Sequence, residues 1–482
     1  MKRPGEILII SCYELGHQPI GLASPIGFLE RAGYRPDAID LSVQKLDLQK
    51  VRRARLIAIS VPMHTALRIG SVVAARIREV NPSCHVTFFG LYSSLNADTL
   101  LATSADSVIG GEYETPLVSL IEDLASGRNR PIEGVSTYRR TASPLLTHLP
   151  FAAPSRFTLP PLKEYAHLEC GGIRRQVGYV EASRGCRYHC RHCPIPPVYG
   201  GRFFLVPREI VLEDIRRLVE MGATHITFGD PDFLNGPVHS LRIIRSMHQL
   251  FPDLTFDFTA KIEHLLRYQT LLPELAALGC LFIVSAVESL NEAVLNHLAK
   301  NHTRADVVKA IHLVHGNGIA LRPSLVPFTP WTMLEDIVEL FDFVEREGLI
   351  DYLDPVQYTI RLLIPPGSLL LSEPSVAPTL GSLAQESFTY QWTHPDPRID
   401  RLQGLFSEVV EKETQAEKDP ETIFYQLKEL AHAARDGRPP LNVAHRSHAE
   451  RHRPPRLTEA WFCCAEPTKD QFAVLEASEK SS

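Results

Sequence analysis

The sequence predicts an α/β protein in which a doubly wound parallel sheet domain precedes a partial (β/α)6 barrel and a mostly helical or irregular carboxyl-terminal region. Short apolar runs alternate with amphipathic stretches in residues 1–127, which is the pattern of a doubly wound sheet. Six repeats of strand then helix follow in residues 176–365, as expected for part of a parallel barrel. A chain of 482 residues is long enough for two or three domains.

The first region, residues 1–127, has strand candidates at "EILIISC", "LIAISV" and "HVTFFG", with an amphipathic helix at "ALRIGSVVAARIREV". The loops "SVPMHTA", "FFGLYSS" and "GGEYETP" follow predicted strands. Open parallel sheets bind ligands at the carboxyl ends of their strands, so these loops either form a ligand site or belong to an inert scaffold. Residues 128–175 are rich in Pro, Ser, Thr and Arg and are predicted to be a linker.

The second region, residues 176–365, has strand candidates at "QVGYVEASRGC", "HITFGD", "LTFDFTA", "LFIVSAVES", "IALRPSLVP" and "DPVQYTIRLL". Helical patterns such as "PREIVLEDIRRLVEMG" and "LLPELAALG" separate them, so chemistry is expected on the loops after the strands. Residues 366–482 contain helical patterns at "IDRLQGLFSEVVEKETQ" and "PETIFYQLKELAHAAR". The later "HRSHAERHRPPR" fits no single ligand face and is predicted to be a solvated connector.

Composition narrows the class of protein. The formal net charge is -6 and the signs are interspersed, which does not favour nucleic acid as a partner. The apolar run near the start is too short for a signal sequence or a membrane span, so we expect a cytoplasmic protein. Nine cysteines at irregular spacing indicate metal or redox chemistry in a reducing compartment more than a disulfide framework.

Three cysteines, Cys186, Cys190 and Cys193, form the pattern CxxxCxxC in the loop after the first barrel strand. A zinc site usually takes four ligands in two separated pairs, and we rank zinc and disulfide interpretations well below a cluster. Three clustered thiolates instead hold three irons of a 4Fe-4S cluster and leave the fourth iron open. A small molecule that chelates the open iron can then receive an electron.

This pattern and its position resemble the radical S-adenosylmethionine (SAM) superfamily, although His192 stands where many members carry an aromatic residue. The resemblance implies a 4Fe-4S cluster, SAM as cosubstrate and an electron donor such as flavodoxin or ferredoxin. "FGDPDF", which contains Asp230 and Asp232, is similar to the family's segment at the amino end of SAM. "SAVES", which contains Ser285 and Glu288, resembles the segment in which the glutamate meets the ribose.

An amino-terminal sheet domain joined to such a barrel resembles the cobalamin-binding group of the superfamily. "GGEYETPLVSLIEDL" is similar to the closing helix region of those domains. The DxHxxG motif, whose histidine replaces the lower ligand of cobalt, is absent from this sequence. Relatives without the motif include proteins that bind cobalamin and proteins that do not, so the sequence leaves cobalamin binding open.

Cys463 and Cys464 are adjacent in "EAWFCCAEP" near the end of the chain. Such a pair is compatible with buried packing, a strained vicinal disulfide or two soft ligands for a thiophilic centre. "CCAEP" resembles the tail of a small radical SAM group that includes an enzyme of the arsinothricin antibiotic pathway. The resemblance implies transfer of the 3-amino-3-carboxypropyl group of SAM to thiol-bound trivalent arsenic, with arsenite as substrate. Cys170 or Cys280 would add a third sulfur if folding brings one close.

Two other functions stay open. The first is a cobalamin-dependent radical SAM methyltransferase that acts on an unactivated carbon or phosphorus of a small natural product. The second is an iron-sulfur or thiol sensor without turnover, although a sensor scarcely needs a complete barrel with a site loop.

Overall fold

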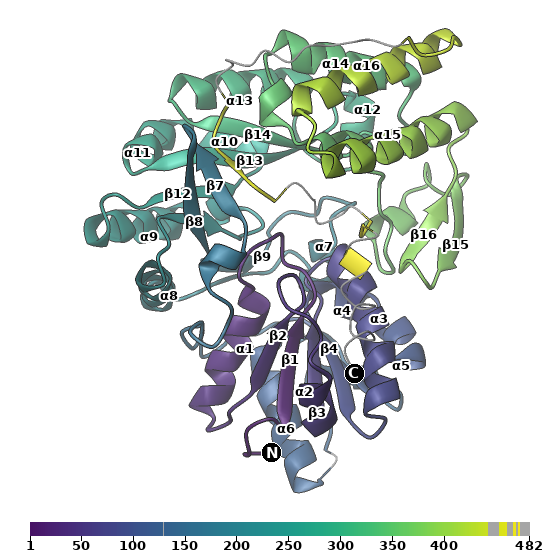
Figure 1. Ribbon diagram of the computed structural model, residues 1–482. Helices are drawn as coiled ribbons and strands as arrows, with labels where there is room; N and C mark the ends of the chain where they lie inside the picture. Colours follow the sequence, from purple (N-terminus) through teal and green to yellow (C-terminus); the bar gives the residue numbers. More distant parts are fainter. Residues whose placement is uncertain (129, 442–452, 460–465, 469–470, 473–482) are drawn as a thin grey trace.

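The computed structural model describes residues 1–128, 130–441, 453–459, 466–468 and 471–472 (Figure 1). Two α/β bodies are stacked in Figure 1, with the amino-terminal sheet domain below and the barrel-like domain above. The predicted α/β class and the order of the two domains are confirmed.

The amino-terminal domain is a six-stranded sheet in the order β2-β1-β3-β4-β5-β6. Its first five strands are parallel, and the central strands are buried along their whole length because helices cover both faces. The strands are β1 (Ile7–Ser11), β2 (Asp37–Asp40), β3 (Leu56–Ser60), β4 (His85–Phe89), β5 (Ser107–Ile109) and β6 (Val135–Thr137). The helices are α1 (Ile20–Arg31), α2 (Leu48–Arg53), α3 (His64–Val80), α4 (Leu91–Leu95), α5 (Ala97–Thr103) and α6 (Glu114–Ser126).

The stretch predicted as a linker, residues 128–175, holds regular structure. Strand β6 pairs antiparallel with β5 and extends the first sheet past residue 127. Strand β7 (His167–Cys170) pairs antiparallel with the first barrel strand. Both strands are very short and lie among prolines, so their apolar periodicity is too brief to identify in the sequence.

The second domain is a seven-stranded curled sheet in the order β14-β13-β12-β11-β8-β7-β17. Five of its strands are parallel: β8 (Ile173–Val180), β11 (His225–Phe228), β12 (Thr255–Thr259), β13 (Cys280–Glu288) and β14 (Ala320–Leu325). The covering helices are α8 (Arg208–Glu220), α9 (Pro237–Leu250), α10 (Ile262–Arg267), α11 (Leu272–Ala277), α12 (Glu292–His297), α13 (Arg304–Gly316) and α14 (Leu334–Arg346).

The prediction of a sixth barrel strand at "DPVQYTIRLL" is wrong. Residues Pro355–Thr359 form a 3-10 helix, and beyond it Arg361 makes only an isolated parallel bridge to Phe328. Pro355 has no amide hydrogen for a sheet ladder, and its fixed φ suits the first turn of a helix. The barrel is therefore a half-barrel of five parallel strands.

The carboxyl-terminal region has the two predicted helices, α15 (Pro397–Gln415) and α16 (Pro420–Asp436), with α16 packed on α14. It also has an unpredicted hairpin, β15 (Leu380–Ala384) and β16 (Thr389–Trp392). Shorter elements of the chain are α7 (Ile195–Tyr199), β9 (Ser183–Gly185), β10 (Phe203–Leu205), and 3-10 helices at Leu162–Glu164, Phe233–Asn235, Gln269–Leu271, Ile350–Tyr352 and Leu369–Ser372.

The last described residues return to both domains. Strand β17 (Arg456–Leu457) pairs antiparallel with β7 at the edge of the half-barrel. Further on, Glu466 lies 3.1 Å from His64 Nε2 and 2.5 Å from Arg68 Nη1 of α3. Most of the predicted connector "HRSHAERHRPPR" lies outside the described residues.

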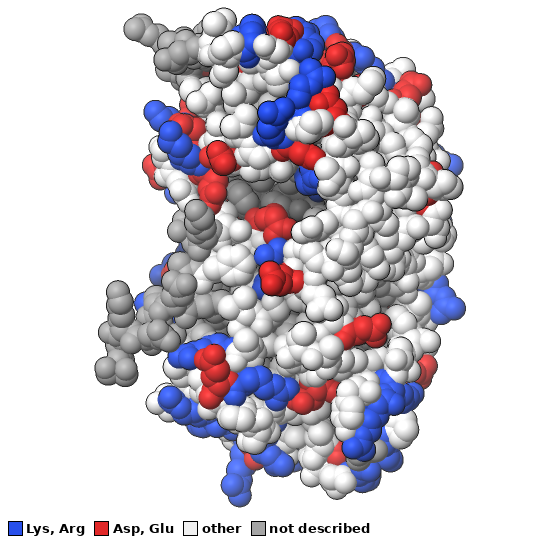
Figure 2. All heavy atoms as spheres, turned by 90° about the vertical axis from the view of Figure 1, so that its right-hand side faces the viewer, with Lys and Arg blue, Asp and Glu red and all other residues white. Residues whose placement is uncertain are grey.

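Surface charge agrees with the composition. On the face in Figure 2, Lys and Arg side chains are interspersed with Asp and Glu, without a continuous basic patch. None of the helices in the described part of the chain is both long and apolar enough to cross a membrane.

Candidate active site

The three thiols of the predicted cluster loop come together between β8 and α7. Cys186 and Cys190 are buried and Cys193 is half-buried. The Cys193 amide donates to the Cys190 carbonyl at 3.2 Å, and Asn235 Nδ2 donates to Cys186 Sγ at 3.5 Å. Burial, and then the charges of the two neighbouring thiols, raise the pKa of Cys193 to about 12.

The three thiols are available as ligands of a cluster. All three cysteines are free of disulfides. Within the described ranges, no three His, Cys, Asp or Glu side chains are grouped around one ion position. A 4Fe-4S cluster takes one thiolate per iron, so its ligands stand further apart than those that share one zinc.

Glu288 ends β13 beside this loop and has a φ of 65°, a left-handed conformation that is costly for a glutamate. One of its oxygens lies 3.0 Å from Lys300 Nζ and 3.1 Å from His192 Nε2. Burial would raise the pKa of Glu288, but Lys300 and His192 bring it well below the usual range. The side chain is therefore a fixed carboxylate at the cluster loop.

The other predicted SAM residues make internal contacts. Asp230 accepts from the Ala182 amide at 2.9 Å and from the Ser183 hydroxyl, and burial raises its pKa to about 7. Asp232 Oδ1 accepts from the Leu234 amide at 3.0 Å. The Ser285 hydroxyl donates to the Ala260 carbonyl at 2.7 Å. These contacts brace the loops after the strands, and their roles toward SAM stay predictions.

A cavity of about 400 Å³ lies between the half-barrel and the carboxyl edge of the first sheet. Glu288, His192 and Cys193 line it on the barrel side. Leu15 and His17 line it from the loop after β1, and Tyr92 lines it from α4. Most of the remaining lining is apolar, including Phe228, Phe282, Val284, Ala286, Val326 and Leu457. Both sheets thus present the ends of their strands to one space.

His17 fixes one side of this cavity. Its ring stacks on that of Tyr179 from β8, with centroids 4.6 Å apart and planes inclined by 21°. Burial lowers the pKa of His17 to about 3, and its Nδ1 is buried without a hydrogen-bond partner. The wall is therefore an uncharged imidazole at neutral pH.

A second cavity of about 450 Å³ lies at the ends of β1 and β2 and is lined by Cys12, Leu41, Ser42 and Ile69 among others. Glu459, two residues after β17, lines both cavities. One residue therefore borders both cavities near the carboxyl edge of the first sheet.

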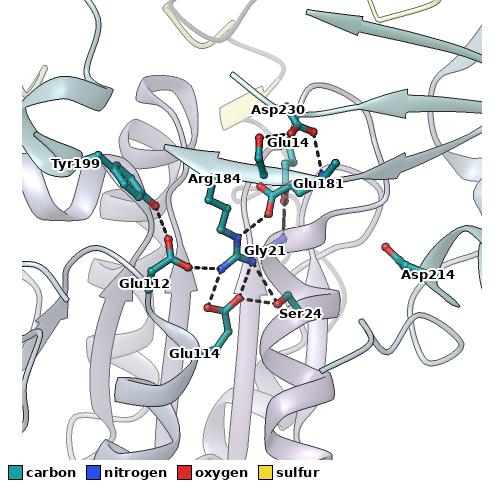
Figure 3. Close-up of polar contacts among 12 residues, drawn as sticks. Glu14, Gly21, Ser24, Glu112, Glu114, Glu181, Arg184, Tyr199, Asp214 and Asp230 are labelled. Carbon is teal, nitrogen blue, oxygen red and sulfur yellow. Dashed lines mark hydrogen bonds and ion pairs between the residues drawn. The ribbon is translucent and has the colours of Figure 1, made fainter. Parts of the chain in front are cut away.

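Arg184, which sequence reasoning missed, ties the cluster loop to the amino-terminal domain (Figure 3). It is 7% exposed, and its guanidinium forms ion pairs with Glu112, Glu114 and Glu181. The signal in the sequence was an arginine two residues before Cys186, together with the acidic loop "GGEYE". Their contact depends on how the two domains pack, which neither segment shows alone.

Among the other predicted thiols, the two that the structure describes, Cys170 and Cys280, are not part of this arrangement. Cys170 ends β7 and Cys280 begins β13, so both lie at the amino ends of the parallel strands, opposite the cluster loop. Cys463 and Cys464 lie outside the described residues. The described residues on either side of that segment are Glu459, which lines both cavities, and Glu466, which contacts His64 and Arg68 of α3.

Known proteins show the same domain. Residues 180–344 match the Radical SAM superfamily. The chain is 23% identical to the hopanoid C-3 methylase of Methylococcus capsulatus, over 65% of this chain and 62% of that protein. It is 25% identical to the bacteriochlorophyllide d C-12(1)-methyltransferase of Chlorobaculum tepidum, over 45% of each protein. In both comparisons the chain spans less than two thirds of the relative's length.

Two solved structures share the fold. The cobalamin-dependent SAM radical enzyme OxsB, with aqua-cobalamin and SAM bound, has a TM-score of 0.67 at 15% identity, covering 88% of this chain and 72% of its own. The radical SAM methyltransferase TsrM of Kitasatospora setae, with cobalamin and a 4Fe-4S cluster bound, has a TM-score of 0.57 at 18% identity, covering 72% and 71%.

A half-barrel with three free thiols at the carboxyl ends of its strands defines an iron-sulfur enzyme that activates a small molecule by reduction. Residues 180–344 are a radical SAM domain by their match to that superfamily, and proteins similar to the chain include methyltransferases. The predicted 4Fe-4S cluster and SAM are confirmed as the cofactor and cosubstrate of this class.

Proposed function

We propose that this chain is a cobalamin-dependent radical SAM methyltransferase that acts on a small molecule. The observation that carries the proposal is the shared cavity, where the cluster loop and the carboxyl edge of the first sheet face one space. The names of the relatives and the cobalamin and SAM bound in OxsB support it.

The barrel side of the cavity would bind SAM. Cys186, Cys190 and Cys193 would hold the cluster, which supplies the electron that cleaves SAM when it is bound. Glu288 would accept hydrogen bonds from the ribose hydroxyls, because it is a fixed carboxylate that lines the cavity beside Cys193. Its contacts with Lys300 and His192 would keep that carboxylate charged and oriented.

On the sheet side of the cavity we place cobalamin. Leu15, His17 and Tyr92 give an apolar and uncharged wall, which suits the broad face of a corrin. The adjoining cavity at β1 and β2 offers more room at the same sheet edge. The sequence has no DxHxxG motif, but His17, in the loop after β1, would offer a neutral imidazole to this side of the cavity.

A second candidate function is the transfer of the 3-amino-3-carboxypropyl group of SAM to arsenite, as in hydroxyarsinothricin synthase. The CCAEP resemblance favours it, and so do the two described flanks of that segment, since Glu459 lines the cavity and Glu466 contacts α3. Cys463 and Cys464 would then hold trivalent arsenic as soft thiolates. In either function, a flavodoxin or ferredoxin would donate the electron.

Product analysis separates the candidates. The reconstituted full chain is incubated anaerobically with SAM, a strong reductant and hydroxocobalamin, with arsenite present or omitted, and products are identified by mass spectrometry. The methyltransferase is expected to retain cobalamin through gel filtration and to give S-adenosylhomocysteine and 5'-deoxyadenosine. If the protein retains no cobalamin and gives methylthioadenosine with an arsenic-containing amino acid, the methyltransferase proposal is wrong and the second candidate function is supported. If no product derived from SAM is formed, the iron-sulfur or thiol sensor is the function that remains.

The tail cysteines provide a matched control in that reaction. Cys463→Ser and Cys464→Ser are expected to leave the cluster and the SAM products unchanged if the chain is a methyltransferase. If arsenite is the acceptor, the same variants should stop formation of the arsenic product while uncoupled SAM cleavage continues.

A further inference from the structure

The cluster loop is clamped at both flanks by one loop of the amino-terminal domain. On one flank, Arg184 Nη1 donates to Glu112 Oε2 at 3.1 Å and to Glu114 Oε2 at 2.9 Å, and Nη2 donates to Glu114 Oε1 at 2.7 Å. On the other flank, the Tyr199 hydroxyl at the end of α7 donates to Glu112 Oε1 at 2.9 Å. Glu112 therefore holds residues before and after the three cysteines (Figure 3).

The loop that carries these carboxylates is itself fixed. Gly111 has a φ of 75°, and a Cβ there would lie 2.2 Å from the Leu145 carbonyl oxygen, so only glycine fits. The Glu112 amide donates to the same carbonyl at 2.8 Å. Behind it, the Ser24 hydroxyl of α1 donates to Glu114 Oε1 at 2.6 Å. The clamp is thus built on rigid parts of the first domain.

These buried ion pairs fix the position of the cluster loop more than they stabilise the fold. Glu112 and Glu114 are almost fully buried, and buried ion pairs recover their desolvation cost only when the geometry is good. The planar guanidinium contacts both carboxylates at once, which the single ammonium of a lysine does not reproduce. The rings of Tyr113 and Phe151, with centroids 5.3 Å and 5.4 Å from the guanidinium carbon, confine it further.

We propose that Arg184 is a positioning residue that fixes the cluster loop on the amino-terminal domain and so sets how the three thiols hold the cluster. Tyr199 acts with it through Glu112. The proposal rests on the cluster cysteines and is independent of cobalamin and of the acceptor. It makes the amino-terminal domain part of the cluster site, in addition to any ligand that the domain binds.

A second buried arginine in the same chain provides a matched control. Arg156 is fully buried, and it donates to Asp214 at 2.6 Å and 2.8 Å and to Gln18 of the first domain at 3.2 Å. Arg184→Gln and Arg156→Gln each remove a buried guanidinium between the domains, but only Arg184 lies in the cluster loop. Loss of domain packing alone would therefore affect both variants alike.

The full chain and both variants are reconstituted anaerobically and compared by iron content, Tm, the EPR spectrum of the reduced cluster with and without SAM, and the rate of SAM cleavage. Both variants are expected to lower the Tm. Arg184→Gln alone should change the EPR g values and slow SAM cleavage by about tenfold or more, because misplaced reacting groups lose rate steeply. Arg156→Gln should keep the wild-type spectrum.

Milder variants keep the test open if Arg184→Gln does not fold. Tyr199→Phe removes one hydroxyl and is expected to change the same EPR spectrum to a smaller extent, with iron content unchanged. Arg184→Lys keeps the charge but loses the planar guanidinium that contacts both carboxylates. Its EPR spectrum and its rate of SAM cleavage should therefore lie between those of wild type and Arg184→Gln. The proposal is overturned if Arg184→Gln matches Arg156→Gln in spectrum and rate, or if Tyr199→Phe and Arg184→Lys both have the wild-type spectrum.

Discussion

The three cluster cysteines differ from the other thiols of the described chain in lying together on one loop. Replacement of Cys186, Cys190 or Cys193 by alanine is expected to abolish the cluster and all SAM cleavage, because each thiolate holds a separate iron. Iron analysis and the absorbance of the reconstituted protein measure this loss. Cys170→Ala, at the opposite end of the strands, is the control and should keep its iron. A fully active variant at any of the three positions would refute the assignment.

Glu288 is the residue whose contacts most directly support a role toward SAM. Glu288→Gln is expected to weaken SAM binding by roughly tenfold, about 1.4 kcal/mol, since the charge that orders the group is removed and Lys300 is left buried without its anion. Binding is measured from the SAM-dependent change in the EPR spectrum. Glu292→Gln, on the exposed start of α12, should bind SAM normally. Unchanged affinity in Glu288→Gln would discard the ribose assignment.

Among the elements, β17 anchors the carboxyl-terminal tail to the half-barrel. The Thr458 amide after β17 donates to the His167 carbonyl at 2.8 Å, and Arg456 forms an ion pair with Glu169. Thr458→Pro removes that donor and should release the tail, seen as faster proteolysis after residue 440, while the cluster content stays normal. Thr458→Ser keeps both the amide and the hydroxyl that accepts from the His167 amide at 2.8 Å, so it should resist the protease like wild type. Equal cleavage of the two variants would show that β17 does not hold the tail.

For the whole molecule, local patterns predicted the two domains, and long-range contacts account for what was missed. The parallel strands and long helices have clear periodicity, and the cysteine trio is contiguous, so both were found in the sequence. The contacts of Arg184 and Lys300 are visible only in the structure, because Arg184 pairs with a distant loop and Lys300 pairs with Glu288, which lies 12 residues earlier in the chain. The prediction of a sixth strand was wrong because Pro355 has no amide hydrogen for a sheet ladder, although the residues after it form an apolar run.

The junction of the domains also predicts a dependence of stability on pH. Glu14, in the loop after β1, accepts from the Gly21 amide at 3.2 Å, and burial together with the charge of Glu181 raises its pKa from 4.5 to about 8. Between those values the folded protein keeps a proton that the unfolded chain has lost. Unfolding therefore releases a proton, and the free energy of unfolding falls as the pH rises, by at most about 1.4 kcal/mol per pH unit.

Glu14→Gln cannot ionise, so it should lose less stability than wild type when the pH is raised from 6 to 8. The Tm of each protein at the two pH values measures this difference. Glu30→Gln, at an exposed position of α1, is expected to keep the wild-type dependence. If Glu14→Gln and wild type lose the same Tm over this range, the proton is not held at Glu14, and another buried carboxyl at the junction, such as Asp230, becomes the group to replace.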